Sequence, residues 1–161
     1  YSILILYDMM KESDGVQISN ERNNAVLALT LAVSHAMLEL NLDHEVGRVV
    51  EGTCQSVPVH SESTYEKMMY HLLYRQIQEK KSRGDVLDYL LRSNVRNTYT
   101  KLIYITPEYD DSMVRQISRN LDMTILQVTE NQSVSSVETQ EYSVIAIDAA
   151  EYRNKTYTIS I

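Results

Sequence analysis

The sequence predicts an α/β fold, a three-layer α/β/α sandwich whose mainly parallel sheet carries an antiparallel hairpin at one edge. Short apolar runs alternate along the chain with longer segments of helical periodicity, which is typical of a parallel sheet with helices on both faces. Two β-rich runs separated by a short turn interrupt this alternation once. The 161 residues, 43% of them hydrophobic, suffice for one core, so we expect residues 1–161 to form a single domain.

The first part of the chain contains a strand, a long helix and the hairpin. Ser2–Leu6 is a short run of Ile and Leu, the pattern of a strand buried on both faces. Glu21–Leu40 is apolar on nearly all sides, and Ser19 or Asn20 can cap its start, so we expect a long helix packed on more than one side. The hairpin is predicted from Glu45–Glu51 and Ser56–His60, with residues 52–55 as its turn.

Helices and strands alternate in the rest of the chain. Apolar residues at steps of three and four predict a helix over Thr64–Ile77 and a short helix that begins at Asp85. The strand Lys101–Thr106 stops at a proline, and Asp110 or Asp111 can cap the helix that follows. The remaining predicted elements are a strand at Met123–Thr129, a polar surface loop from Asn131 to Gln140, and two final strands, Tyr142–Ile147 and Thr156–Ile161, joined by a turn at Asn154 and Lys155.

Composition argues against several classes of function. Fifteen Lys and Arg against 22 Asp and Glu give a net charge of −7, whereas nucleic-acid binding needs a basic face. The single Cys54 cannot form an intramolecular disulfide, so folding needs no oxidising compartment. The longest nearly apolar run, Ala25–Val33, covers less than half of the about 20 residues that a membrane span needs. We therefore expect no nucleic-acid partner and no span within these residues.

Catalytic and cofactor motifs are missing from the sequence. The four histidines lack the i, i+4 spacing of a helical metal pair. The four glycines form neither a Gly-x-Ser-x-Gly nucleophile elbow nor a phosphate-binding loop after the first strand. We therefore expect the protein not to be an enzyme and to use no cofactor.

Four segments together carry a family resemblance: the opening strand Ile3–Asp8, the helix segment Glu21–Leu29, the stretch His44–Gly52 and the strand Lys101–Thr106. In this order they resemble the von Willebrand factor A (VWA) domain, most closely the version in bacterial proteins of the domain-of-unknown-function family fifty-eight. The resemblance covers nearly the whole chain and implies a VWA-like fold.

The resemblance also implies a divalent-metal site at the carboxyl end of the sheet, written Asp-x-Ser-x-Ser. Hydroxyl and carboxylate oxygens at this spacing suit a hard cation such as Mg²⁺. In this chain Asp8 takes the first position, but Met10 and Glu12 take the next two, and Ser13 is out of register by one residue. A thioether is a poor ligand for a hard cation.

Two later loops complete the family's site with a Thr and an Asp. Thr64 is the match for the threonine, whereas Thr106 is followed by Pro107 and Glu108 without an Asp at the expected place. Asp110 comes only later. We therefore predict a degenerate site that holds no metal.

These features predict a noncatalytic protein–protein interaction domain that binds its partner through the loops at the carboxyl end of the sheet. The candidate contact residues are Asp8, Glu12, Ser13, Thr64 and Asp110. The resemblance implies that the chain is part of a longer, membrane-anchored bacterial protein, with this domain on the cytoplasmic face and the membrane helices outside these residues. It also implies a MoxR-type AAA ATPase as the partner.

Two alternatives remain open at this point. In the first, Asp8, Ser13, Thr64 and Asp110 or Asp111 form an unorthodox Mg²⁺ site that binds an acidic residue of the partner. In the second, the same edge of the sheet is the site of an α/β hydrolase or of a phosphate-handling α/β protein.

Overall fold

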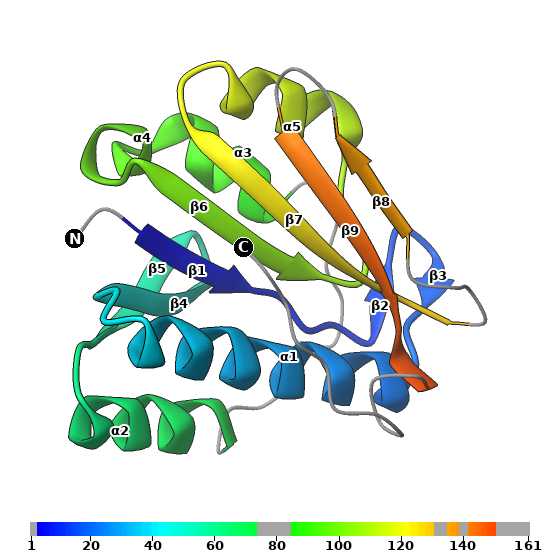
Figure 1. Ribbon diagram of the computed structural model, residues 1–161. Coiled ribbons are helices and arrows are strands. Elements are labelled where there is room, and N and C mark those ends of the chain that lie inside the picture. The colour runs from blue at the N-terminus through cyan, green and yellow to red at the C-terminus, as the bar shows by residue number, and fades with distance from the viewer. Residues whose placement is uncertain (1–2, 74–84, 131–134, 139–141, 151–161) are drawn as a thin grey trace.

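A seven-stranded sheet forms the middle layer of the computed structural model, which describes residues 3–73, 85–130, 135–138 and 142–150 (Figure 1). The strand order is β5-β4-β1-β6-β7-β9-β8. The five inner strands run parallel, whereas β5 and β8 run antiparallel to their neighbours at the two edges. The strands of this sheet are β1 (Ile3–Tyr7), β4 (His44–Val50), β5 (Thr53–Val59), β6 (Lys101–Thr106), β7 (Asp122–Thr129), β8 (Ser135–Glu138) and β9 (Tyr142–Asp148).

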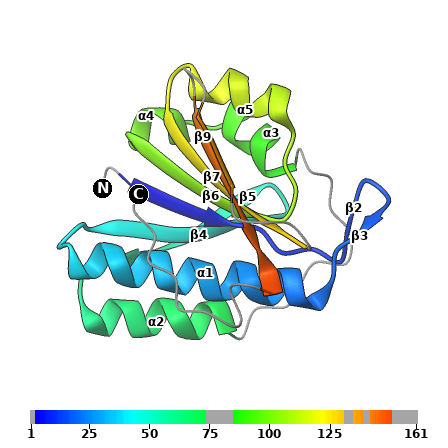
Figure 2. The same cartoon turned by 45° about the vertical axis from the view of Figure 1, so that its right-hand side comes forward.

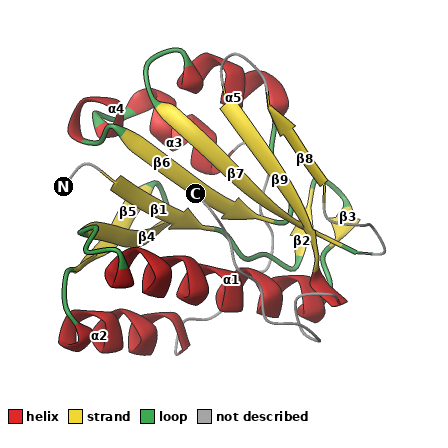
Figure 3. Ribbon diagram, viewed as in Figure 1, coloured by secondary structure: helices red, strands yellow, loops and turns green. Residues whose placement is uncertain are grey.

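Helices cover both faces of the sheet, which confirms the predicted three-layer fold (Figure 2, Figure 3). One face carries α1 and α2, and the other carries α3, α4 and α5. The helices span α1 (Asn20–Glu39), α2 (Glu62–Leu73), α3 (Asp85–Arg92), α4 (Val95–Thr98) and α5 (Asp111–Ser118).

Each face of the sheet has its own apolar core, and β1 contributes to both. Ile5 and Tyr7 pack with α1 and α2, whereas Leu4 and Leu6 pack with α3 and α5. Successive side chains of a strand point to opposite faces, so a strand covered on both sides must be apolar at every position. This explains the uninterrupted apolar run that predicted the strand.

Two turns of the structure contain Gly at positive φ. The predicted β4–β5 hairpin has a two-residue turn at Glu51 and Gly52, with φ of 50° and 74°, so β5 begins at Thr53 and not at Ser56. A second, unpredicted hairpin joins β2 (Glu12–Ser13) to β3 (Val16–Gln17) through Asp14 and Gly15, with φ of 49° and 84°. An Asp-Gly pair favours this type of turn, so the signal for β2 and β3 was present in the sequence.

Other differences from the sequence predictions concern the second half of the chain. The predicted loop Asn131–Gln140 is wrong at Ser135–Glu138, because these residues form β8 and pair with β9. The short helix α4 was not predicted. The predicted strand Thr156–Ile161, its turn at Asn154 and Lys155, and the predicted helix beyond residue 73 lie outside the described residues.

Candidate functional site

Asp8 lies at the carboxyl end of the sheet, directly after β1, and is only 3% exposed. The hydroxyl of Tyr104, from the middle of β6, donates a hydrogen bond to Asp8 Oδ2 at 3.0 Å. The backbone N–H of Asp8 donates to the carbonyl oxygen of Ile105 at 2.9 Å and so continues the ladder between β1 and β6. The carboxylate is therefore held in the protein interior by a phenol from the neighbouring strand.

The loop after Asp8 is held by the side-chain amide of Asn23, in the first turn of α1. The N–H of Met10 donates to Asn23 Oδ1 at 3.0 Å, and Asn23 Nδ2 donates to the Met10 carbonyl at 2.8 Å. Asn23 Nδ2 also donates to the carbonyl of Ser19, the residue that caps α1. Met10 is fully buried as a result. Its thioether fills the protein interior at the position where the resemblance implies a metal-ligating serine.

Arg22 links the start of α1 to the ends of two strands. Its Nε donates to the Val128 carbonyl at 3.0 Å, and its Nη2 donates to the Pro107 carbonyl at 2.6 Å. Glu108 Oε1 lies 3.6 Å from Nη2 and forms an ion pair with the guanidinium. This role of Arg22 was not predicted from the sequence. The available signal was a cation in the first turn of a helix, where the helix dipole disfavours positive charge.

The loop after β6 is organised by its own side chains. Thr106 Oγ1 donates to the Glu108 carbonyl at 2.7 Å and accepts from the Glu108 N–H at 3.3 Å. Asp110 caps α5, as predicted, because its Oδ1 accepts from the N–H of Met113 at 3.0 Å. These contacts hold the loop between β6 and α5 in its conformation.

Asp111, the first residue of α5, accepts hydrogen bonds from two side chains beside this loop. The Tyr142 hydroxyl donates to Asp111 Oδ1, and Arg115 Nε donates to Asp111 Oδ2 at 2.9 Å. These two hydrogen bonds lower the pKa of Asp111, the one from Tyr142 having the larger effect. Burial, and next the bond to Asp111, raise the pKa of Tyr142 to about 12. Asp111 therefore remains a carboxylate, and Tyr142 remains a hydrogen-bond donor at neutral pH.

Glu12 and Ser13 belong to the β2–β3 hairpin, which lies beyond the carboxyl ends of the strands (Figure 2). Glu12 is half-buried, whereas Ser13 is fully buried. Within the described part of the chain the Ser13 hydroxyl oxygen has no hydrogen-bond partner. We use the name carboxyl rim for this hairpin together with Asp8 and the loop over residues 107–110.

Thr64 lies at the opposite end of the sheet from the carboxyl rim, which corrects its assignment to the predicted contact residues. His44, the first residue of β4, pairs with Val59, the last residue of β5, so the chain leaves β5 at the amino end of the parallel strands (Figure 1). Thr64 Oγ1 accepts hydrogen bonds there from the N–H groups of Ser61 and His60. Its hydroxyl orders the start of α2, which begins at Glu62 rather than Thr64.

The residues at the carboxyl rim do not fit the metal site that the resemblance implies. Met10 is buried at the second ligand position, Asp8 is bonded to Tyr104, and Thr64 lies at the other end of the sheet. Over the described residues, no group of three or more His, Cys, Asp or Glu side chains is arranged to hold a metal ion.

Comparisons with known proteins identify the fold. No family model matches the chain, and no curated protein matches it. The crystal structure of the SpRpn10 VWA domain matches with a TM-score of 0.52 and 11% identity, over 92% of this chain and 88% of that one. The Deinococcus radiodurans RO (RSR) protein aligns with a TM-score of 0.49 and 14% identity, over 92% of this chain and 32% of its own.

The likeness to the SpRpn10 domain, together with the strand order, shows that this protein has a VWA-like fold. None of the helices among the described residues has the length and apolar character needed to cross a membrane.

Proposed function

We propose that this VWA-like domain is a noncatalytic protein-interaction module that binds its partner through the carboxyl rim. The observation that carries the proposal is the way Asp8, Asn23 and Arg22 are used: each holds a loop or strand end in place. The rim is therefore a preorganised surface, and preorganisation lowers the conformational cost of binding a protein.

The charge of the carboxyl rim favours a partner with a basic surface. Glu12, Asp14 and Asp110 are acidic and at least partly exposed, and the whole chain carries a net charge of −7. Complementary charge raises the association rate and disfavours acidic partners. A MoxR-type AAA ATPase, the partner that the family resemblance implies, is the first protein to test.

Binding of a purified MoxR-type ATPase to the domain, measured by biolayer interferometry, tests this proposal. The double variant Glu12→Gln/Asp14→Asn neutralises the hairpin and keeps its side-chain shapes. We expect this variant to weaken binding at least fivefold and to make it less sensitive to salt.

The double variant Asp43→Asn/Glu66→Gln is the matched control, because it removes two exposed charges elsewhere in the chain. Equal binding by both double variants would refute the role of the rim. Failure of the ATPase to bind the unmodified domain would remove this partner from the proposal.

The Mg²⁺-dependent alternative is favoured by one observation, the buried Ser13 hydroxyl without a partner among the described residues. A cation that binds only the folded state raises the unfolding midpoint. If this alternative holds, millimolar Mg²⁺ raises the midpoint of the chelator-treated protein, and both Ser13→Ala and Asp8→Asn remove that increase. We expect no increase in any of the three proteins.

Assays of hydrolysis by the unmodified domain and by Asp8→Asn test whether the domain is noncatalytic. We expect the domain to hydrolyse neither aryl esters nor aryl phosphates above background. A turnover that Asp8→Asn abolishes would instead support the hydrolase alternative.

A further inference from the structure

Among the described strands β5 lies at one edge of the sheet, and its pairing with β4 defines which of its backbone groups point outward. The hairpin closes with a two-residue turn, so Val50 and Thr53 form a hydrogen-bonded pair, and every second pair along the ladder is not hydrogen-bonded. The non-hydrogen-bonded positions on β5 are therefore Cys54, Ser56 and Pro58. Their N–H and C=O groups point away from β4.

Two independent features agree with this register. Proline has no N–H, and Pro58 stands at an outward-facing position, where no ladder bond to β4 is lost. Non-hydrogen-bonded pairs bring opposite Cα atoms closest together. At the pair Gly47 and Ser56, a Cβ on Gly47 would lie 2.8 Å from the Cβ of Ser56, which shows this close approach directly.

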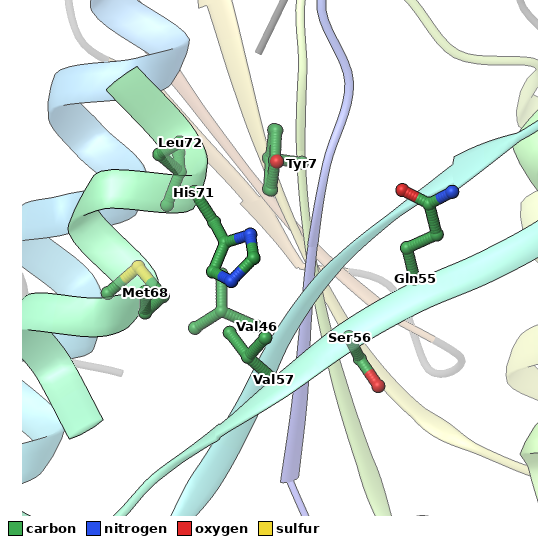
Figure 4. Close-up of a pocket in the computed structure, with 8 residues that line it drawn as sticks. All are labelled: Tyr7, Val46, Gln55, Ser56, Val57, Met68, His71 and Leu72. Atoms are coloured by element: carbon green, nitrogen blue, oxygen red, sulfur yellow. The ribbon is translucent and has the colours of Figure 1, made fainter. Parts of the chain in front are cut away.

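A cavity of about 480 Å³ lies beside β5 on the α2 side of the sheet (Figure 4). Apolar and aromatic residues form one part of its lining, and three exposed polar residues form the other: Tyr7, Val46, Val57, Met68 and Leu72, with Gln55, Ser56 and His71. Figure 4 shows His71 directed from α2 toward the strands. The cavity has the volume and lining for a large apolar or aromatic side chain.

A second cavity, of about 280 Å³, lies on the opposite side of β5, next to α3 and α4. Cys54 and Ser56 of β5 line it, because their side chains alternate with those of Gln55 and Val57 and so point to this face. The rest of its lining carries hydroxyl or amide groups: Tyr89, Ser93, Asn94, Thr98 and Tyr99. This cavity suits a small polar side chain.

We propose that the outer edge of β5 binds a short extended peptide segment of another protein by β-strand addition. The peptide backbone bonds to the outward groups of Cys54 and Ser56, and its side chains alternate between the two cavities. A residue opposite Val57 or Gln55 places a large apolar side chain in the cavity beside α2. A residue opposite Ser56 places a Ser, Thr or Asn side chain in the polar cavity.

The observations favour such a peptide over pairing of β5 with the β5 strand of a second copy of this chain. In a pairing of two β5 strands, the side chains of Thr53, Gln55 and Val57 would enter the apolar cavity, and two of these three are polar. Pro58 also limits extension of the pairing, as prolines on edge strands commonly do. The proposed segment is therefore short, and this surface is independent of the carboxyl rim.

A library of capped six-residue peptides tests the proposal on the full 161-residue chain. In the test peptides Leu, Ile, Phe or Tyr alternates with Ser, Thr or Asn, and control peptides have the same composition with the apolar and polar residues in two blocks. Binding is measured by fluorescence polarisation, and the contact residues by amide chemical shifts. We expect members of the alternating set to bind at least fivefold more tightly than their blocked controls, with the largest shifts at the amides of Cys54 and Ser56.

Two variants separate the backbone contribution from the side-chain contribution. Ser56→Pro removes an outward N–H at a position that makes no ladder bond to β4, as Pro58 already does, and should weaken binding at least fivefold. Ser56→Ala keeps the N–H and should change binding less than twofold. In the peptide, N-methylation at alternate amides should abolish binding, whereas N-methylation at the intervening amides should leave it unchanged.

Several outcomes would overturn the proposal. These are no preference for the alternating peptides, largest shifts at the carboxyl rim, or equal binding by Ser56→Pro and Ser56→Ala. Strong protection of the Cys54 and Ser56 amides from hydrogen exchange in the free protein would show that this edge is already paired. If sedimentation then gave a dimer, a second copy would be the occupant.

Discussion

Replacing Arg22 with alanine should reduce the free energy of unfolding by about 3 kcal/mol. The residue is 9% exposed, and its guanidinium donates to the carbonyls of Val128 and Pro107. Hydrogen bonds from a charged donor contribute about 1.5–3 kcal/mol each, so the two together give about 4 kcal/mol. Removing a cation from the first turn of α1 offsets about 0.5 kcal/mol of this loss, because the helix dipole disfavours positive charge there. Gln127 Nε2, 3.3 Å from the Pro107 carbonyl, lowers the loss further because it still satisfies that oxygen.

Urea unfolding followed by circular dichroism measures this loss, with the slope of free energy against urea expected to stay unchanged. Arg92→Ala is the matched control: Arg92 pairs with Asp88 at 2.8 Å on α3, but its side chain is 69% exposed. An exposed pair of this kind contributes about 0.5 kcal/mol or less. Arg22→Lys should lose more than half as much stability as Arg22→Ala, because an ammonium cannot reproduce the forked geometry. Equal losses for Arg22→Ala and Arg92→Ala would refute the reasoning.

Three further predictions concern buried positions. His44 is buried, and its Nε2 lies 2.6 Å from the Ser34 hydroxyl; burial lowers the pKa of this histidine. The unfolded chain therefore takes up a proton more readily than the folded protein. The contribution of His44 to the free energy of unfolding is fully present above the ordinary His pKa of about 6.5 and declines as the pH falls below it. The thermal midpoint should therefore drop more between pH 7.5 and 5.5 in the unmodified protein than in His44→Asn, and an equal drop contradicts this. Gly47→Ala should cost about 2 kcal/mol in urea unfolding, because its Cβ would lie 2.7 Å from a β5 carbonyl oxygen; a neutral effect would mean that the strands separate at little cost. Tyr104→Phe should cost about 1–2 kcal/mol through the lost bond to Asp8, and a double-mutant cycle with Asp8→Ala that shows no coupling would argue against it.

Features with a strong local signal were predictable. Ser19 caps α1, and Asp110 caps α5, because each side chain bonds to a backbone N–H three residues further along the chain. The apolar run of β1 predicted a strand covered on both faces. The short turn predicted the β4–β5 hairpin. The predicted turn is four residues long, whereas the turn in the structure has two residues.

Features that depend on distant partners were not predictable in the same way. β8 is a short strand of polar character whose existence depends on pairing with β9. The assignment of Thr64 to the carboxyl rim was wrong because β5 runs antiparallel and delivers the chain to the other end of the sheet. A match of residue types along the sequence does not reveal the direction in which a strand runs.

The carboxyl rim contains both kinds of feature, those that local sequence predicts and those that depend on distant partners. The residue identities alone predicted that Met10 is no ligand for a hard cation, because a thioether binds such a cation poorly. The use of Arg22 and Asn23 to hold the rim emerged only from the folded chain. Their partners lie on β7, in the loop after β6 and in the loop after β1, and these contacts form only when the segments pack together in the folded chain. Short-range chemistry is present in the chain before it folds, whereas contacts between remote segments are created by packing.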